Sequence, residues 1–261
     1  MTAVQDIISI KNLNKEYVSS DGKVVRALQN INLDIHEGEF VSLIGPSGCG
    51  KSTLLRLIAD LIQPTNGQLT INGHSAHEAR EKREYGFVFQ SATLYDWRTV
   101  LKNVQLPLEV MRYSRKERDK RAHEMLKLVD LSDFADNYPW QLSGGMQQRV
   151  SIARALAFEP NLLLMDEPFG ALDEMTRERL NNELLDIWGK IPSMTVIFVT
   201  HNISEAVYLS SRVVVMSPRP GRISQIVDID LPRPRGPETL DSDDYFHYIN
   251  QVRHLLREVH D

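Results

Sequence analysis

Short runs of apolar residues, each bounded by turn-forming residues, recur along the chain. They predict strands buried on both faces, because such strands lack the apolar and polar alternation of half-exposed strands. Between them, residues 53–61, 147–157 and 177–188 have apolar side chains at helical spacing. Strand and helix thus alternate, as in a doubly wound α/β fold with a largely parallel sheet. The predicted strands are Phe40–Ile44, Phe87–Phe89, Leu162–Met165, Thr195–Val199 and Val213–Met216.

The pattern changes in the middle of the chain. From about Thr99 to Phe158 the apolar spacing is helical, and no convincing strand interrupts it. We therefore expect an α/β core in two pieces, a helical subdomain inserted between them, and a C-terminal extension. The expected boundaries are 1–95 and 159–230 for the core, 96–158 for the subdomain, and 231–261 for a linker with a C-terminal helix.

Two segments admit alternative interpretations. The charged run at 114–124 is typical of a solvated helix face, with a partner surface as the alternative. After PRPRGP at 232–237, apolar residues on one helical face predict a helix that packs on its own domain or contacts a partner. These apolar residues are Phe246, Ile249, Val252, Leu256 and Val259.

Composition narrows the classes of function. With 261 residues, of which 42% are hydrophobic and 25% charged, the chain has the composition of an ordinary globular protein. Its net charge of −5 argues against nucleic acid as a default partner. No apolar run approaches the roughly 18 residues of a membrane span, and the N-terminus does not resemble a secretion signal, so we expect a cytoplasmic protein. The single cysteine, Cys49, excludes an internal disulfide and a multi-cysteine metal site.

The strongest motif is GPSGCGKS at residues 45–52, which lies between a predicted strand and a predicted helix. Its glycines allow backbone N–H groups to wrap around phosphates, while Lys51 reaches the β- and γ-phosphates and Ser52 offers a hydroxyl to Mg²⁺. The alternative is a glycine-rich turn with an incidental lysine. We interpret Cys49 as a packing residue rather than a catalytic thiol. The expected phosphate-binding residues are Gly45, Pro46, Ser47, Gly48, Cys49, Gly50, Lys51, Ser52 and Thr53.

Four polar residues follow predicted strands, at the sheet edge where open α/β folds bind ligands. In LLLMDE at 162–167, Asp166 is the candidate for holding Mg²⁺ and Glu167 for polarising the attacking water. Solvated charges at a strand end are the alternative. Gln90 and His201 are candidate sensors of the γ-phosphate and water, and Gln90 is also a candidate Mg²⁺ ligand.

A second anion-binding motif, LSGGMQQR at 142–149, places a serine and two glycines before a helix start. Together with GPSGCGKS, Gln90, LLLMDE, ALD at 171–173 and His201, it resembles the ATP-binding cassette ATPases over nearly the whole chain to about residue 225. The resemblance implies a P-loop NTPase core of RecA-like type with a mostly parallel sheet. It also implies an N-terminal antiparallel β part and an inserted helical subdomain.

The resemblance further implies a Mg²⁺-dependent ATPase whose two cassettes associate head to tail as a homodimer closed by ATP. Ser143, Gly144 and Gly145 then contact the γ-phosphate of the partner's ATP. Tyr17 takes the position of the aromatic that stacks on adenine, with ordinary packing as the alternative, and Asp173 that of a carboxylate exchanged across the dimer. The sequence departs from the pattern after His201, where Asn stands in place of a common acidic residue.

What the ATPase drives follows from resemblance alone. A lone cassette looks like the energy subunit of an importer, peripheral on the cytoplasmic face of the membrane and docked on a separate permease, which an extracytoplasmic solute-binding protein supplies. In that family the region of Tyr95 and Trp97 receives the permease, although both could equally be packing residues. LYDWRTVLKNV, MSPRPGRI and LPRPR resemble the nitrate, sulfonate and taurine group. The alternatives are a soluble cassette ATPase acting on nucleic acid or ribosomes, and a P-loop GTPase or kinase.

Overall fold

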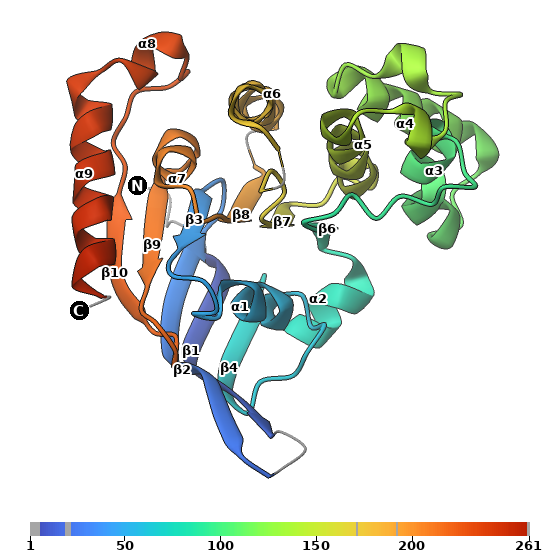
Figure 1. Cartoon of the computed structure of the whole chain (residues 1–261). Helices are drawn as coiled ribbons and strands as arrows, with labels where there is room; N and C mark the ends of the chain where they lie inside the picture. The colour runs from blue at the N-terminus through green and yellow to red at the C-terminus, as the bar shows by residue number, and fades with distance from the viewer. Residues whose placement is uncertain (1–5, 19–21, 171, 192, 260–261) are drawn as a thin grey trace, which may run out of the picture.

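The computed structural model of the chain describes residues 6–18, 22–170, 172–191 and 193–259. Its largest sheet has six strands in the order β10-β9-β3-β8-β7-β6, and all neighbours are parallel except β10 and β9 (Figure 1). This confirms the predicted α/β class and largely parallel sheet. The strands are β3 (Phe40–Ile44), β6 (Tyr85–Val88), β7 (Leu162–Asp166), β8 (Thr195–Val199), β9 (Arg212–Met216) and β10 (Ile223–Asp228).

Alternate residues of the central strands enter two separate hydrophobic cores. In β8, Val196 and Phe198 belong to one core, whereas Ile197 and Val199 belong to the other. This burial on both faces produces the continuous apolar runs seen in the sequence. The first core includes residues of α6 (Glu174–Gly189) and α7 (Ile203–Leu209), and the second includes residues of α1 (Lys51–Ile58).

A four-stranded antiparallel sheet, in the order β2-β1-β4-β5, contributes to the second core. Its long β1–β2 hairpin extends away from the rest of the molecule (Figure 1). The register of this hairpin shifts several times, for example between Ile10 and Leu13. Bulges of this kind break the strict alternation that identifies a strand in a sequence. The elements here are β1 (Asp6–Val18), β2 (Val24–His36), β4 (Asn66–Ile71), β5 (His74–Ser75) and α2 (Ala76–Lys82).

A group of helices lies to one side of the large sheet (Figure 1). Three of them begin at a hydroxyl side chain that accepts a backbone N–H three residues later, at Thr99, Ser114 and Ser143. Such N-caps satisfy otherwise unpaired donors and define the helix start. The helix predicted at 147–157 therefore begins earlier, directly after Ser143. The elements are α3 (Val100–Val110), α4 (Arg115–Leu128), the 3₁₀ turns η1 (Ser132–Phe134) and η2 (Pro139–Gln141), and α5 (Gly144–Leu156).

The C-terminal segment packs on its own chain. Helices α8 (Pro237–Leu240) and α9 (Asp243–Glu258) follow β10, and α9 lies along the edge of the large sheet (Figure 1). The buried guanidinium of Arg235 donates to the carbonyls of Val207, Tyr208 and Ser210 at distances of 2.7–3.1 Å, at the end of α7. Burial lowers the pKa of Arg235 to about 9. None of the helices in the described ranges has the length and apolar character needed to span a bilayer.

Candidate active site

The predicted phosphate loop joins β3 to α1. Gly48 and Gly50 have φ angles of 74° and 108°, a region that glycine adopts without steric cost. Lys51 is buried, and its amine donates to the carbonyls of Gly45 at 2.8 Å and Pro46 at 3.1 Å. The loop therefore combines flexible backbone, a lysine and the N-terminus of a helix, which together favour an anion.

Cys49 lies inside this loop with its side chain buried. Its Sγ is 3.9 Å from the Lys51 amine. Burial, the largest influence, raises the pKa of the thiol above its ordinary value of 9.0, even though the lysine opposes this shift. The neutral thiol is a poor nucleophile, which agrees with the interpretation of Cys49 as a packing residue.

The hydroxyl of Ser52 and the carboxylate of Asp166 come together from two motifs that are far apart in the sequence. Ser52 Oγ, in the first turn of α1, donates to Asp166 Oδ1 at 2.7 Å. Asp166 is the last residue of β7 and is buried, and Arg56 lies 4.0 Å from its second oxygen. Hydroxyl and carboxylate oxygens are donors suited to Mg²⁺, which usually takes few protein ligands and keeps several waters. This pair fits such an ion.

Glu167 turns away from Asp166 because the strand ends between them. Its φ of 45° lies in the left-handed region, which is uncommon for a residue other than glycine. The backbone N–H of Glu167 donates to Val199 O at 3.0 Å, and Oε2 lies 3.2 Å from Nδ1 of His201. The two predicted catalytic residues therefore meet, with His201 supplied by the end of β8.

Glu205 holds the turn that carries His201, a role that the sequence analysis did not anticipate. Its carboxylate accepts a short hydrogen bond from the Thr200 hydroxyl, and its backbone N–H donates to Asn202 Oδ1 at 3.1 Å. Glu205 is only 6% exposed, and Oε1 has no hydrogen-bond partner among the described residues. Burial, only partly offset by Thr200, raises the pKa of this carboxyl.

We expect Glu205 to make folding stability depend on pH. A raised native pKa means that the folded protein binds the proton more tightly than the unfolded chain, so stability is lost as pH rises above the ordinary value of 4.5. Glu205→Gln keeps the shape but cannot ionise. We compare the free energy of unfolding of the wild type with that of Glu205→Gln. The wild-type value minus the variant value should fall by up to about 1.4 kcal/mol per pH unit between the ordinary pKa of Glu205 and its raised pKa in the folded protein.

Chemical denaturation between pH 5 and pH 8 measures this difference, with the exposed Glu37→Gln as a matched control that should show no such trend. A pH-independent difference for Glu205→Gln would mean that the buried carboxyl titrates at its ordinary pKa.

A cavity of about 530 Å³ gathers the phosphate loop and its surroundings. Tyr17, 42% exposed, stands at this cavity, and the amine of Lys15 lies 4.9 Å from its ring centroid. An exposed aromatic ring beside a phosphate site can stack on a nucleotide base. The lining residues are Tyr17, Val25, Ala27, Ser47, Gly48, Gly50, Lys51, Ser52, Thr53, Glu167 and Arg219.

The residues of LSGGMQQR do not line this cavity. Ser143 caps α5 by accepting the N–H of Met146 at 3.3 Å, and Gly145 packs closely against Thr176 of α6. Asp173 caps α6 by accepting the N–H of Thr176 at 3.0 Å, and this contact lowers the pKa of Asp173. Ala171 lies outside the described residues. The second anion-binding motif thus stays separate from the chain's own phosphate loop.

Gln90 follows β6 at the same edge of the sheet as Asp166, because β6 and β7 are parallel neighbours. Its side chain is exposed and does not line the phosphate-loop cavity. The preceding residue is anchored, since Gln148 of α5 donates to Phe89 O at 3.1 Å. Gln90 therefore belongs to a turn that is connected to the helix bearing the second motif.

The parallel sheet, the phosphate loop and the Ser52–Asp166 and Glu167–His201 pairs together define a P-loop nucleotide hydrolase. The sequence profile of the ABC transporter family matches residues 28–170. The chain belongs to this family.

Individual relatives agree with this assignment. An uncharacterized ABC transporter ATP-binding protein of Methanocaldococcus jannaschii is 50% identical over 96% of this chain and 91% of its own length. The nitrate import ATP-binding protein of a Synechocystis species is 44% identical over 96% of this chain and 95% of its own length. The taurine import ATP-binding protein of Rhizobium johnstonii is 45% identical over 87% of this chain and 86% of its own length.

Solved structures also resemble the chain. A dimeric structure of a bacterial ABC transporter cassette superposes with a TM-score of 0.74 at 40% identity, covering 88% of this chain and 99% of that one. A dimeric post-hydrolysis state of an ATP-binding cassette bound to ADP and phosphate gives the same values. The chain is accordingly an ATPase of the ABC type, which binds and hydrolyses ATP.

Proposed function

We propose that the chain is the ATP-hydrolysing subunit of an importer that moves a small solute through a separate membrane permease. The observation that carries this proposal is an apolar groove beside Gln90, on the surface between the α/β core and the helical subdomain. The relatives named for nitrate and taurine import support the same direction of transport. They also favour a small oxyanion or sulfonate as the solute.

In this proposal the nucleotide lies along the phosphate loop of one chain. Tyr17 stacks on the adenine, and the backbone N–H groups of residues 45–53 surround the phosphates. Lys51 leaves the loop carbonyls that it contacts and binds the β- and γ-phosphates. Ser52, Asp166 and Gln90 would hold Mg²⁺, which would neutralise charge on the phosphates.

Hydrolysis proceeds by in-line attack of water on the γ-phosphate. Glu167 orients and polarises that water, and His201, held 3.2 Å from the Glu167 carboxylate, contacts the γ-phosphate. Thr200 and Glu205 fix the turn that presents His201. This arrangement places the charged groups before reaction begins, which is the main source of rate in phosphoryl transfer.

The second anion-binding motif completes the site of a partner chain. Ser143, Gly144 and Gly145 present a hydroxyl and the first N–H groups of α5 to the γ-phosphate of the partner's ATP. Asp173, at the start of α6, faces the partner across the same interface. Two chains therefore form a homodimer with two composite sites that ATP closes.

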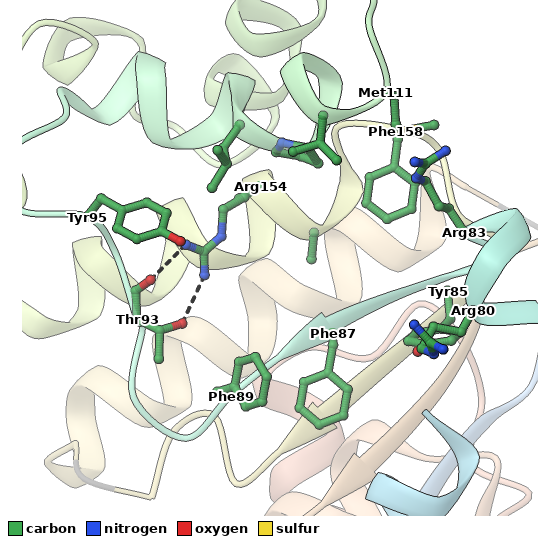
Figure 2. A pocket seen from close by; sticks show the side chains of 14 residues that line it. Arg80, Arg83, Tyr85, Phe87, Phe89, Thr93, Tyr95, Met111, Arg154 and Phe158 are labelled. Carbon is green, nitrogen blue, oxygen red and sulfur yellow. Dashed lines mark hydrogen bonds between the residues drawn. The ribbon is translucent and has the colours of Figure 1, made fainter. Parts of the chain in front are cut away.

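The proposed permease groove has a volume of about 600 Å³. Figure 2 shows the rings of Phe87 and Phe89 beside one another on one wall, while Arg80 and Arg83 stand at the rim. Tyr95 also lines the groove at 40% exposure, and its neighbour Trp97 is 74% exposed. Exposed aromatics of this kind favour a partner over internal packing. A short permease helix with an apolar face and an acidic residue matches this surface.

Arg154 connects the groove to the second anion-binding motif and to the segment that follows Gln90. It lies on α5, which begins at the second anion-binding motif, and it donates to Ala92 O at 2.9 Å and to Thr93 O at 2.8 Å. Figure 2 shows its contact with Thr93. These carbonyls belong to the segment that follows Gln90. Displacement of this segment by the permease is thereby transmitted along α5 to Ser143.

The remaining assignments follow from this role. The chain works at the cytoplasmic face of the membrane as a peripheral subunit, and a solute-binding protein acts on the other side. The nucleotide-binding core comprises residues 1–95 and 159–230, the helical subdomain 96–158, and the linker with the C-terminal helix 231–261. The subdomain then carries Ser143 and the part of the groove that includes Val110 and Met111, whereas Phe87 and Phe89 belong to the core.

Affinity capture of the tagged chain from detergent-solubilised native membranes, with ATP present, tests the transport role. Mass spectrometry should identify a polytopic membrane protein. Recovery of only ribosomes, nucleic acid or soluble proteins would overturn the transport assignment and leave the ATPase chemistry intact.

Val110→Glu makes this test specific for the groove. Val110 lines the groove and is 62% exposed. A carboxylate introduced here would be buried when the permease docks, so recovery of the permease should fall about tenfold or more. Ile226→Glu is the matched control, because Ile226 is 40% exposed on β10 and does not line the groove. Equal recovery with both variants would exclude the groove as the docking surface.

A further inference from the structure

The turn between β9 and β10, SPRPGR at residues 217–222, has no part in the nucleotide chemistry described above. It is fixed to β2 by backbone hydrogen bonds. Gly221 N donates to Ala27 O and Gln29 N donates to Gly221 O, both at 2.9 Å. Within the turn, Ser217 N donates to Arg222 O at 2.9 Å. The turn therefore has a defined position relative to β2.

This turn also packs directly on the phosphate loop. A Cβ atom on Gly221 would lie 1.9 Å from Cys49 O, a distance that no side chain could occupy. Glycine is thus required here for close approach of the two backbones. Cys49 is flanked by Gly48 and Gly50 of the expected phosphate-binding loop. A side chain that extends from the turn toward Cys49 therefore lies close to the place where the phosphates are expected.

Arg219 is that side chain. It lines the same cavity as Tyr17 and Lys51, and its Nη2 lies 3.5 Å from Gly48 O, at the long limit of a hydrogen bond. Its guanidinium is exposed and forms no ion pair with a carboxylate in the described part of the chain. Arg222 of the same turn differs, since its Nη2 donates to Gln29 Oε1 at 2.7 Å.

We infer that Arg219 binds the phosphate chain of ATP. The guanidinium fork matches phosphate oxygens, and the weak contact with Gly48 O is easily exchanged for an anionic acceptor. Lys51 approaches the phosphates from within the loop, whereas Arg219 approaches from its outer side. Arg219 thus adds a second cation to the site, and it acts on nucleotide binding rather than on the attacking water. This inference rests on the proposed assignment of the phosphate loop as the ATP site.

The test is a titration of ATP onto Arg219→Ala at a protein concentration low enough for gel filtration to give a monomer. We expect ATP affinity to fall roughly five- to tenfold, the effect of one charge-assisted contact at a partly exposed site. The affinity of the variant should also depend less steeply on salt than that of wild type, because one cationic contact is missing. In turnover assays KM should rise while kcat is retained.

Two further variants separate the possible outcomes. Arg222→Ala, in the same turn but directed to β2, should bind ATP as wild type does. Equal losses in both variants would trace the effect to the turn's packing and overturn the inference, as would wild-type affinity in Arg219→Ala. A loss confined to conditions that form the dimer would assign Arg219 to the partner interface instead, which also overturns it.

Lys51→Ala distinguishes failure of this inference from failure of the assigned site. If Lys51→Ala loses ATP binding while Arg219→Ala retains it, only the role of Arg219 is wrong. If Lys51→Ala binds ATP normally, the assignment of the phosphate loop itself fails.

Discussion

Glu167→Gln should lower the turnover of ATP by roughly 10²- to 10⁴-fold while ATP binding is retained. The expected loss is large because Glu167 is the carboxylate that we propose polarises the water, and it follows the end of β7 with its Oε2 3.2 Å from His201 Nδ1. Glutamine preserves the shape and can still contact His201, but it cannot accept a proton. Steady-state phosphate release and ATP titration measure the two effects separately.

Glu37→Gln is the matched control for this change. Glu37 is exposed in the turn between β2 and β3 and does not line the phosphate-loop cavity, so turnover should remain unchanged when its charge is removed. Turnover within a few fold of wild type in Glu167→Gln would show that another group activates the water.

Ser143→Arg should reduce turnover at least 100-fold without weakening ATP binding to the isolated chain. Ser143 does not line the phosphate-loop cavity of its own chain, so its replacement leaves that site intact. In the proposed dimer, a long cationic side chain would fill the space where the first N–H groups of α5 are expected to meet the partner's γ-phosphate. Measured on the same preparation, turnover should therefore fall while ATP affinity is unchanged.

Ser114→Arg controls for the loss of a helix cap. Ser114 caps α4 by accepting an N–H at 3.3 Å, as Ser143 caps α5, so both variants should lose about 1 kcal/mol of stability. Only Ser143→Arg should lose turnover. A parallel fall in Ser114→Arg would attribute the effect to an unstable subdomain rather than to the partner's site.

The parts of the fold that are buried on both faces could be predicted from the sequence. Strands β3 and β8 have the predicted bounds, because their continuous apolar runs end at turn residues on both sides. Helix α1 begins at Lys51 rather than Thr53, since Gly50 adopts the left-handed conformation that caps it. The antiparallel β part came only from the family resemblance, because the bulges in β1 and β2 disrupt their alternation.

The site follows the same division. Residues of short motifs, such as Lys51 in the phosphate loop and Asp166 at the end of β7, could be located from the sequence. The residues that surround and position these motif residues could not be located from the sequence, because they are distant in the sequence and belong to no motif. Glu205 carries no sequence signal beyond its place in α7, and Arg219 reaches the phosphate loop only because Gly221 permits close backbone contact.

We propose that ATP joins two copies of this chain into a dimer with composite sites. Sedimentation equilibrium of Glu167→Gln, with and without Mg²⁺ and ATP, measures this association, because the variant is expected to bind ATP without hydrolysing it. We predict a monomer without nucleotide, a dimer with ATP, and a monomer under both conditions when Ser143→Arg is added. A Glu167→Gln chain that remains monomeric when saturated with ATP would show that ATP does not join two copies of this chain.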